Sequence, residues 1–576
     1  MDAPGGISSG VLTLNGQPLT ASRFKRRCAL VGQEDHHWAF LTCKETIRYA
    51  ADLYMPISKE EKDREVDNLV AKMGLDSCAD TLVGNQFMKG LSGGQMRRLS
   101  LAVILLKKLD VVILDEPTSG LDAASAASIM TFVSELTKKE QLIMIFTIHQ
   151  PSSYIYETFD RLMLLSAGRI AYCGSRENVL PYFAQIKNPV PPQTNPAEFM
   201  LDLVNKDFSD EEKVNAVLDA WDREGDPDHQ KRIAAQMTVY DTKSSMAVQS
   251  DYQVGLFTQI VTMFRRHTLL AFRDPMLYTG RAMAFLFSTL FFAIIYLKAR
   301  DRVQDQAFQR CFFVMWILGV PSCMGVIAVF AYNTEFNAIR REVKNGMVSP
   351  LSYLLANTVL TIPVMFLFAI AGTGISAYAI MNYNGDRFGD VMITYAVVMF
   401  CFESISQALS VSFENPLLGM LGFMNFWFGS FLFSGMFITI EDIVWPFQVF
   451  AYILPLRYGI QTMVYHEFIA VDFKGAALCT PGSSATCLSH SGDTGTNEGW
   501  ACSDGSTDER GCVGKSGWQI LDTMHNSFDV VESDIDSLIN LVIILAIAVV
   551  AKICYVLLMA KKANAITQIT AAAGPA

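Results

Sequence analysis

The sequence predicts an α/β domain followed by an all-α membrane domain with six transmembrane helices. The first observation is the bulk composition: 576 residues are too many for one compact core, and 51% hydrophobic against 18% charged residues is typical of a membrane protein. The second is a step in composition, because residues 1–250 carry dense charge whereas the chain after about Leu269 alternates long apolar runs with short polar breaks. We therefore expect a soluble front domain and a membrane-embedded rear domain.

The front domain, residues 1–205, has the pattern of a parallel sheet. Residues 111–114 and 142–147 are short, wholly apolar runs, and a helical pattern separates them. This arrangement is typical of parallel strands that crossover helices bury on both faces. Ahead of them, residues 11–22 predict a β-hairpin with its turn at Asn15-Gly16.

The rear domain, residues 256–576, follows a polar and irregular stretch, residues 206–255, which we interpret as a linker. It holds six apolar segments that approach or exceed the roughly 20 residues needed to cross a bilayer. They lie near residues 279–297, 311–331, 355–380, 391–409, 417–437 and 538–559. A seventh stretch, residues 443–463, contains Pro446, Pro455 and Arg457, so we expect it to be re-entrant or interfacial.

The distribution of basic residues sets the expected orientation. Six crossings place both the front domain and the C-terminus in the cytosol, where Lys561 and Lys562 follow the last span. Arg340, Arg341 and Lys344 fall in an inner loop under the same count. The first ten residues have no apolar core of a signal peptide. The chain is thus expected to be a multi-pass protein of the plasma membrane or an endomembrane, with an extracellular loop at residues 464–536.

The net charge limits the expected binding partners, and the cysteine positions predict disulfides. The formal net charge of −11 argues against nucleic acid, which selects basic surfaces. Four cysteines crowd the polar loop after the fifth span: Cys479, Cys487, Cys502 and Cys512. An even set in a Gly/Ser/Thr-rich loop suggests two disulfides on the oxidising side of the membrane, with the pairing open.

The motif with the clearest chemistry is the apolar run of residues 111–114 followed by Asp115 and Glu116. It places two carboxylates at the carboxyl end of a buried strand, where α/β sheets bind their ligands. Asp115 could hold Mg²⁺ through water, and Glu116 could orient or deprotonate an attacking water. An apolar run before two acids also occurs by chance, so the motif needs further support.

Two neighbouring motifs give that support. Upstream, Leu91 is followed by Ser92, Gly93, Gly94 and Gln95 and then by a helical pattern, so backbone N–H groups at a helix start could approach a phosphate. Taken alone, these glycines would only indicate a serine-capped turn. Downstream, residues 117–122 end at Asp122, and His149 ends the next apolar strand. A histidine at a strand end is more often structural than catalytic, but if this strand runs beside the first, its imidazole lies near where a γ-phosphate would sit.

In this order, the sequences LSGGQ, VVILDEPTSGLD and TIHQPS resemble an ATP-binding cassette (ABC) domain. The likeness is closest to the G subfamily, the White/pleiotropic-drug-resistance type, because TIHQPSSYIYETFDRLMLLSAGRIAYCG and the segment at residues 334–342 match it. That last segment resembles the subfamily's coupling segment but departs at Phe336 and Val348, where arginine and tyrosine are usual.

The resemblance implies a set of roles. Gln33 corresponds to the glutamine that senses Mg²⁺, Asp115 to its carboxylate ligand, Glu116 to the catalytic base and His149 to the switch histidine. Nucleotide contacts are implied for Ser92, Gly93, Gly94, Gln95 and Asp122. The cofactors are ATP and Mg²⁺. The assembly is a homodimer or a heterodimer with another half-transporter in the lipid bilayer.

One element of the family is missing from the sequence. No G-x-x-x-x-G-K-[ST] string, the loop that grips the β- and γ-phosphates, occurs in the 576 residues. Because Val11–Gly16 resembles the strand and turn that follow this loop, we expect the chain to begin after it. Either a longer N-terminus supplies the loop, or the chain is a catalytically incompetent or regulatory subunit that needs a complete partner.

The resemblance also implies a central cavity between two protomers for a hydrophobic or lipid-like molecule. The second and fifth spans border it, with Phe313, Trp316, Asn425 and Phe428 as candidate substrate contacts. Each of these could equally face lipid or pack against a neighbouring helix. Within the spans, we expect Arg281 and Lys552 to snorkel, whereas Glu403 is a candidate either for transport or for a structural hydrogen bond.

Overall fold

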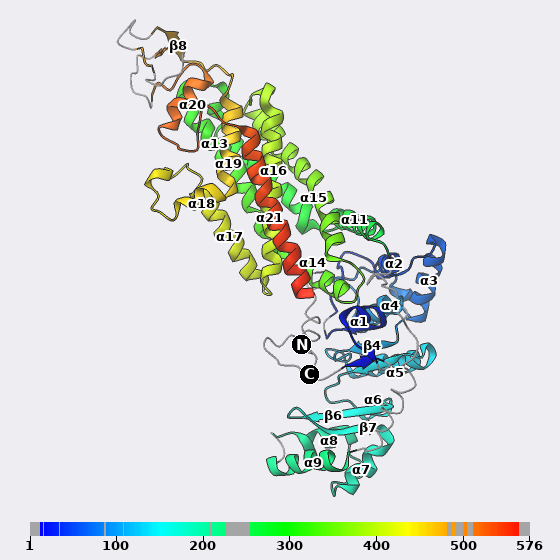
Figure 1. The fold of residues 1–576 in the computed structure, drawn as a ribbon. Helices are drawn as coiled ribbons and strands as arrows, with labels where there is room; N and C mark the ends of the chain where they lie inside the picture. Colours follow the sequence, from blue (N-terminus) through cyan, green and yellow to red (C-terminus); the bar gives the residue numbers. More distant parts are fainter. Residues whose placement is uncertain are drawn as a thin grey trace. The chain divides into compact units, whose positions relative to one another are not determined.

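The computed structural model describes residues 12–14, 17–33, 35–85, 88–107, 109–206, 210–225, 254–480, 487–489, 499–503 and 511–563 (Figure 1). The chain divides into two compact units. The first comprises Met1–Gly255 together with Arg341–Val348 and Ala563–Ala576, and the second comprises Leu256–Arg340 and Ser349–Lys562. Each unit is described separately.

The first unit is built on a short parallel sheet in the order β3-β4-β5. Its strands are β3 (Cys28–Val31), β4 (Val111–Leu114) and β5 (Ile143–Phe146), and both neighbouring pairs run parallel. The apolar runs predicted the β4–β5 pair, whereas β3 was not expected. The hairpin is also present as β1 (Thr13–Leu14) and β2 (Gln17–Pro18), although its turn at Asn15-Gly16 lies outside the described residues.

Several helices precede, connect or follow these strands. They are α1 (Ala21–Arg27), α2 (Cys43–Tyr54), α3 (Lys59–Lys72), α4 (Gly93–Leu105), α5 (Ala123–Glu140), α6 (Ser153–Glu157) and α7 (Val179–Gln185). Leu101 and Ile104 of α4 and Ile129 and Val133 of α5 form one core with the strands. This packing fixes the starts of α4 and α5, which carry two of the predicted motifs.

Part of the expected linker belongs to this unit. Helix α9 (Glu211–Glu224) lies after β6 (Arg161–Ser166), β7 (Arg169–Ser175) and α8 (Pro196–Val204). Its apolar residues recur at helical spacing, and Val214, Val217 and Leu218 are buried against the β7 core. Glu211–Glu224 is therefore a packed helix, which corrects the irregular structure expected there.

The second unit is helical. Among the described residues, five helices are long and apolar enough to span a membrane. They comprise α12 (Gly280–Ile295), α13 (Ala307–Cys323) with α14 (Gly325–Lys344), α15 (Pro350–Thr373), α16 (Phe388–Ser412) and α21 (Ser537–Ala563). The fifth expected span is α17 (Pro416–Leu432), whose 17 residues make about 25 Å of helix, less than the roughly 30 Å hydrocarbon core.

Two further details differ from the expected spans. The segment at residues 334–342 is not a loop, because α14 continues to Lys344. Helix α17 ends five residues before the expected end of its span, and Gly435 follows with φ +85°, a left-handed conformation that a continuing helix cannot contain. After it, the seventh stretch forms two short helices, α18 (Gln448–Ile453) and α19 (Pro455–Phe468), which agrees with the expectation that it does not span.

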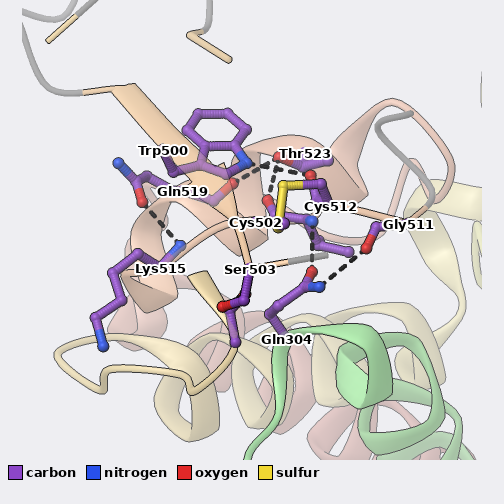
Figure 2. The surroundings of a disulfide bond; sticks show 11 residues. Gln304, Trp500, Cys502, Ser503, Gly511, Cys512, Lys515, Gln519 and Thr523 are labelled. Atoms are coloured by element: carbon purple, nitrogen blue, oxygen red, sulfur yellow. Dashed lines mark hydrogen bonds between the residues drawn. A yellow bond between two sulfur atoms is a disulfide. The ribbon is translucent and has the colours of Figure 1, made fainter. Parts of the chain in front are cut away.

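The cysteine-rich loop contains both predicted disulfides, and the structure gives their pairing as Cys479–Cys487 and Cys502–Cys512. Strands β8 (Ala476–Cys479) and β9 (Gly499–Cys502) and helix α20 (Gly517–His525) surround them. Figure 2 shows how Gln304, just before α13, joins this loop: its Nε2 donates to Gly511 O at 2.9 Å and its Oε1 accepts from Val513 N at 2.7 Å.

The ionisable residues in the spans are paired inside the unit. Arg281 donates two bonds to Glu403, at 3.1 and 2.5 Å, and Tyr332 donates a third at 2.6 Å. Lys552 donates to Gln407 Oε1 at 2.5 Å. Arg281 and Lys552 therefore do not snorkel as expected, because a buried carboxylate and a buried amide accept their hydrogen bonds. This finding favours the structural alternative for Glu403.

Candidate functional site

The two carboxylates at the end of β4 are held by the neighbouring strand. Thr147, the residue after β5, donates from Oγ1 to Asp115 Oδ1 at 2.7 Å and accepts from the backbone N–H of Glu116 at 2.9 Å. The parallel register of β4 and β5 brings these residues to the same sheet edge. Asp115 and Glu116 are both half-buried, so they are reachable from solvent yet fixed in position.

Gln33 follows β3 and completes this cluster. Its Nε2 donates to Glu116 Oε2 at 2.8 Å and approaches Ser119 Oγ at 3.4 Å. Glu116 has φ +44°, a left-handed conformation that is uncommon for a side-chain-bearing residue and typical of functional turns. Three of the predicted site residues, Gln33, Asp115 and Glu116, thus meet at one point although they are 83 residues apart in sequence at the widest.

The glycine motif caps a helix. Ser92 is the N-cap of α4, where its Oγ accepts from Gln95 N at 3.3 Å and Gln95 Oε1 accepts from Ser92 N at 2.9 Å. A Cβ at Gly93 would lie 2.8 Å from the Leu121 side chain, whereas one at Gly94 would meet nothing within 4 Å. The helix start is therefore open on the Gly94 side, where its N–H groups could meet an anion.

Sequence reasoning missed the residue that joins these two motifs. Arg97 of α4 is 3% exposed and donates to Gly32 O at 2.8 Å and Gln33 O at 2.9 Å. It also contacts Asp35 Oδ1 at 3.3 Å. These bonds tie the glycine-motif helix to the segment that carries Gln33. An arginine two residues after the glycine motif was the only available signal, and it did not name the partners.

Two predicted residues make other contacts or none. Asp122 is the N-cap of α5, accepting from Ala124 N at 3.1 Å and Ser125 N at 2.9 Å. The hydrogen bond from the Ser125 hydroxyl lowers the pKa of Asp122 below its usual value. His149 is exposed, two residues beyond Thr147, and makes no hydrogen bond to the residues that the structure describes. The structure therefore does not bring His149 into contact with Glu116.

The same unit includes residues 341–348, which lie between α14 and α15 in the chain. Arg341 Nη2 donates to His37 Nδ1 at 2.7 Å, which leaves the proton on Nε2 facing Ser100 Oγ at 2.8 Å, and Ser100 donates to Asp35 at 2.5 Å. Burial, and then the Arg341 charge, lower the pKa of His37 well below its usual value. Trp38 Nε1 also donates to Glu342 Oε1 at 2.7 Å. A polar chain thus links residues 341–348 to Asp35, which Arg97 joins to the Gln33 segment.

One face of β5 differs from the expectation that both faces are buried, and the outer edge of this strand is also open among the described residues. Ile143 is 58% exposed and Ile145 is 55% exposed, and no described strand pairs with this edge. Beside it lies a hollow of about 290 Å³ lined by Val133, Leu142, Phe146, Phe159 and neighbouring residues. The described sheet therefore ends at an open apolar edge.

The candidate substrate residues occupy different environments. Phe313 is fully buried and packs against Tyr296 and Tyr383. Trp316 is partly buried and stacks on Phe292 with ring centroids 5.3 Å apart. On α17, by contrast, Asn425 is exposed and Phe428 is 59% exposed. Only the α17 pair lies on an accessible face of this unit.

Comparison with known families agrees with this architecture. Residues 4–119 match the ABC transporter family, whereas residues 149–217 and 258–468 match two ABC-2 type transporter families. The first match covers Gln33 and the LSGGQ and VVILDE motifs, and the last covers most of the helical unit. The chain therefore belongs to the ABC transporters, with an ATP-binding-cassette domain ahead of its membrane domain.

Individual relatives narrow this class. The chain is 28% identical to ABC transporter G family member 7 of Arabidopsis thaliana, over 81% of this chain and 66% of the relative. It is 29% identical to ATP-binding cassette sub-family G member 8 of Rattus norvegicus, over 77% of this chain and 66% of the relative. It is 26% identical to the broad substrate specificity ATP-binding cassette transporter ABCG2 of Sus scrofa, over 82% of this chain and 75% of the relative. The chain is homologous to these G-family half-transporters.

Proposed function

We propose that this chain is one half of a dimeric transporter that uses ATP to export hydrophobic or lipid-like molecules across a membrane. The observation that carries the proposal is the cluster of Gln33, Asp115, Glu116 and Thr147, joined by hydrogen bonds of 2.7 to 2.9 Å in a chain that continues into a membrane domain. This arrangement suits the orientation of a water beside a phosphate. We place the nucleotide-binding domain and the C-terminus in the cytosol.

The donor set of this cluster fits Mg²⁺. The Gln33 amide nitrogen faces Glu116, so the amide oxygen is left for water or metal, and Asp115 bonds to Thr147 through Oδ1 alone among the described residues. Carboxylate and amide oxygens are the ligands that Mg²⁺ prefers. Asp115 and Gln33 would hold the ion through water, and the ion would neutralise phosphate charge. Glu116 would then accept a proton from the attacking water.

A phosphate-binding loop would have to come from outside the described residues. The open edge of β5 supports a specific place for it, since a fourth parallel strand there would end beside Thr147, and the helix that follows such a strand could cover Ile143 and Ile145 on the exposed face. A strand with an attached phosphate loop, from further chain or from another polypeptide, would complete the site. Without it, this chain's Ser92 and Gly93 could still serve a complete partner's nucleotide.

The alternative function is a catalytically incompetent or regulatory subunit in a heterodimer. The absence of G-x-x-x-x-G-K-[ST] from the 576 residues favours it for this chain on its own. A dimer also fits α17: Asn425 is exposed between Leu421 and Phe428, and an unpaired amide facing lipid is costly. A face that borders a second protomer and a shared cavity would satisfy that amide.

Two matched serines test the composite site. Ser92 and Ser58 both cap helices through a capping box, so replacing either with alanine costs about 1 kcal/mol of helix stability. In a heterodimer with a loop-containing G-family half-transporter, Ser92→Ala should lower Mg-ATPase activity at least tenfold, whereas Ser58→Ala should not. Equal activity of the two variants would contradict the proposed role of the motif.

A further inference from the structure

Helix α11 (Leu256–Arg273) is the first helix of the membrane unit, and it has two unlike faces. One face is buried and packs along α15. It includes Met263, Arg266, His267 and Leu270, each at most 5% exposed. The other face carries the most exposed residues of the helix, and no described element covers them.

The buried face fixes the depth of α11 relative to the spanning helix α15. Gln259 Oε1 accepts from Ser349 N at 3.0 Å and from Ser352 Oγ at 2.7 Å, and Ser349 is the N-cap of α15. Further along, the rings of His267 and Tyr353 lie 5.1 Å apart. Helix α11 therefore runs beside the first turns of α15, the level at which a membrane-spanning helix leaves the aqueous phase.

The exposed face combines large apolar groups with one cation. Phe257 is 79% exposed and Phe272 is 85% exposed, at opposite ends of the helix. Val261 and Arg265 lie between them; Val261 is half-buried, and Arg265 is exposed without a hydrogen bond or ion pair to any described residue. At 3.6 residues per turn these four side chains fall within an arc of about 80°.

Two phenylalanines exposed to this degree on an amphipathic helix are unfavourable in water and favourable in the headgroup layer. The central guanidinium adds an attraction for phosphate or carboxylate headgroups. We propose that the face of Phe257, Val261, Arg265 and Phe272 docks into the cytosolic leaflet and binds anionic phospholipid there. This inference needs only the membrane insertion of the helical unit and is independent of ATP use.

Photo-crosslinking in vesicles tests the proposal. The full chain with p-benzoylphenylalanine at Phe272 is reconstituted into phosphatidylcholine and phosphatidylserine at a ratio of about 4:1 and irradiated. Adducts should be mainly to phospholipid, with phosphatidylserine enriched about fivefold over its mole fraction, as expected for one cation near an anionic surface. Substitution at Phe257 repeats the test should the first variant fold poorly.

Two control variants separate charge from position. Arg265→Gln in the crosslinking background should return the adducts to the mole fraction of each lipid. Arg300→Gln, which removes an exposed arginine from the segment between α12 and α13, should leave the enrichment unchanged. Adducts to a second copy of the chain or to its α/β domain would overturn the proposal, as would phosphatidylserine adducts at only the mole fraction.

Discussion

The buried pair of Arg281 and Glu403 makes the sharpest stability prediction. Its two hydrogen bonds, of 3.1 and 2.5 Å, join side chains that are at most 3% exposed, and Tyr332 donates a third bond to the same carboxylate. Glu403→Gln leaves the guanidinium buried without its counter-charge, which costs about 3 to 5 kcal/mol. In a unit of this size, we expect the melting temperature to fall by about 6 to 15 °C.

The double variant Arg281→Met/Glu403→Met removes both charges and should melt close to the wild type, because a paired charge replaced by apolar groups costs little. The assay is thermal unfolding of the detergent-solubilised chain, with Asp386→Asn, at an exposed position of the short 3₁₀ helix Gly385–Arg387, as the control. A Glu403→Gln variant that melts like Asp386→Asn would contradict this expectation, as would a double variant as unstable as the sum of the single variants Arg281→Met and Glu403→Met.

Three further predictions concern the other contacts. Thr147→Val removes the hydrogen bonds to Asp115 and Glu116. In a heterodimer with a loop-containing half-transporter it should lower Mg²⁺-dependent ATPase activity about tenfold. The control Thr137→Val, which loses only a hydrogen bond to Val133 O, should leave the activity unchanged. Because the pKa of His37 is lowered in the folded state, the folded chain binds fewer protons than the unfolded chain as the pH falls below about 6.5. The free energy of unfolding should therefore fall by up to about 1.4 kcal/mol between pH 7.5 and 5.5. Denaturant titrations should show that His37→Gln abolishes this loss, and a variant with the same pH dependence as the wild type would contradict the prediction. Gln304→Leu leaves Val513 N and Gly511 O without their hydrogen-bond partner. Hydrogen exchange of the backbone amides around Cys512, measured by mass spectrometry, should therefore become faster. An unchanged exchange rate would count against the contact.

Local pattern predicted β4 and β5, since both are short apolar runs separated by a helical pattern, and it predicted a serine-capped helix start at Ser92; it did not predict β3. It did not predict α9, because four apolar residues at helical spacing are easily overlooked in a highly charged stretch. The end of α17 depended on the backbone conformation of Gly435, which the hydropathy of the flanking residues does not indicate.

The candidate site also contains residues that the sequence predicted and residues that it did not. Strand-end reasoning placed Asp115 and Glu116 at the edge where a parallel sheet binds its ligands, whereas Gln33 was predicted only from the family resemblance, because no strand was expected before it. The motifs did not indicate that Thr147 and Arg97 tie this cluster together, because those contacts join segments 32 and 64 residues apart. For the same reason the counter-charge of Glu403 could not be named: Arg281 lies 122 residues away.

The central claim is that this chain holds the water-orienting cluster and the glycine-motif helix of a composite ATP site, whose phosphate loop does not occur among these 576 residues. Mg-ATPase activity of the purified 576-residue chain, alone and co-assembled with a loop-containing G-family half-transporter, tests it most directly. We expect no turnover by the chain alone and turnover in the co-assembly that depends on Ser92. Robust hydrolysis by the chain alone would contradict the account.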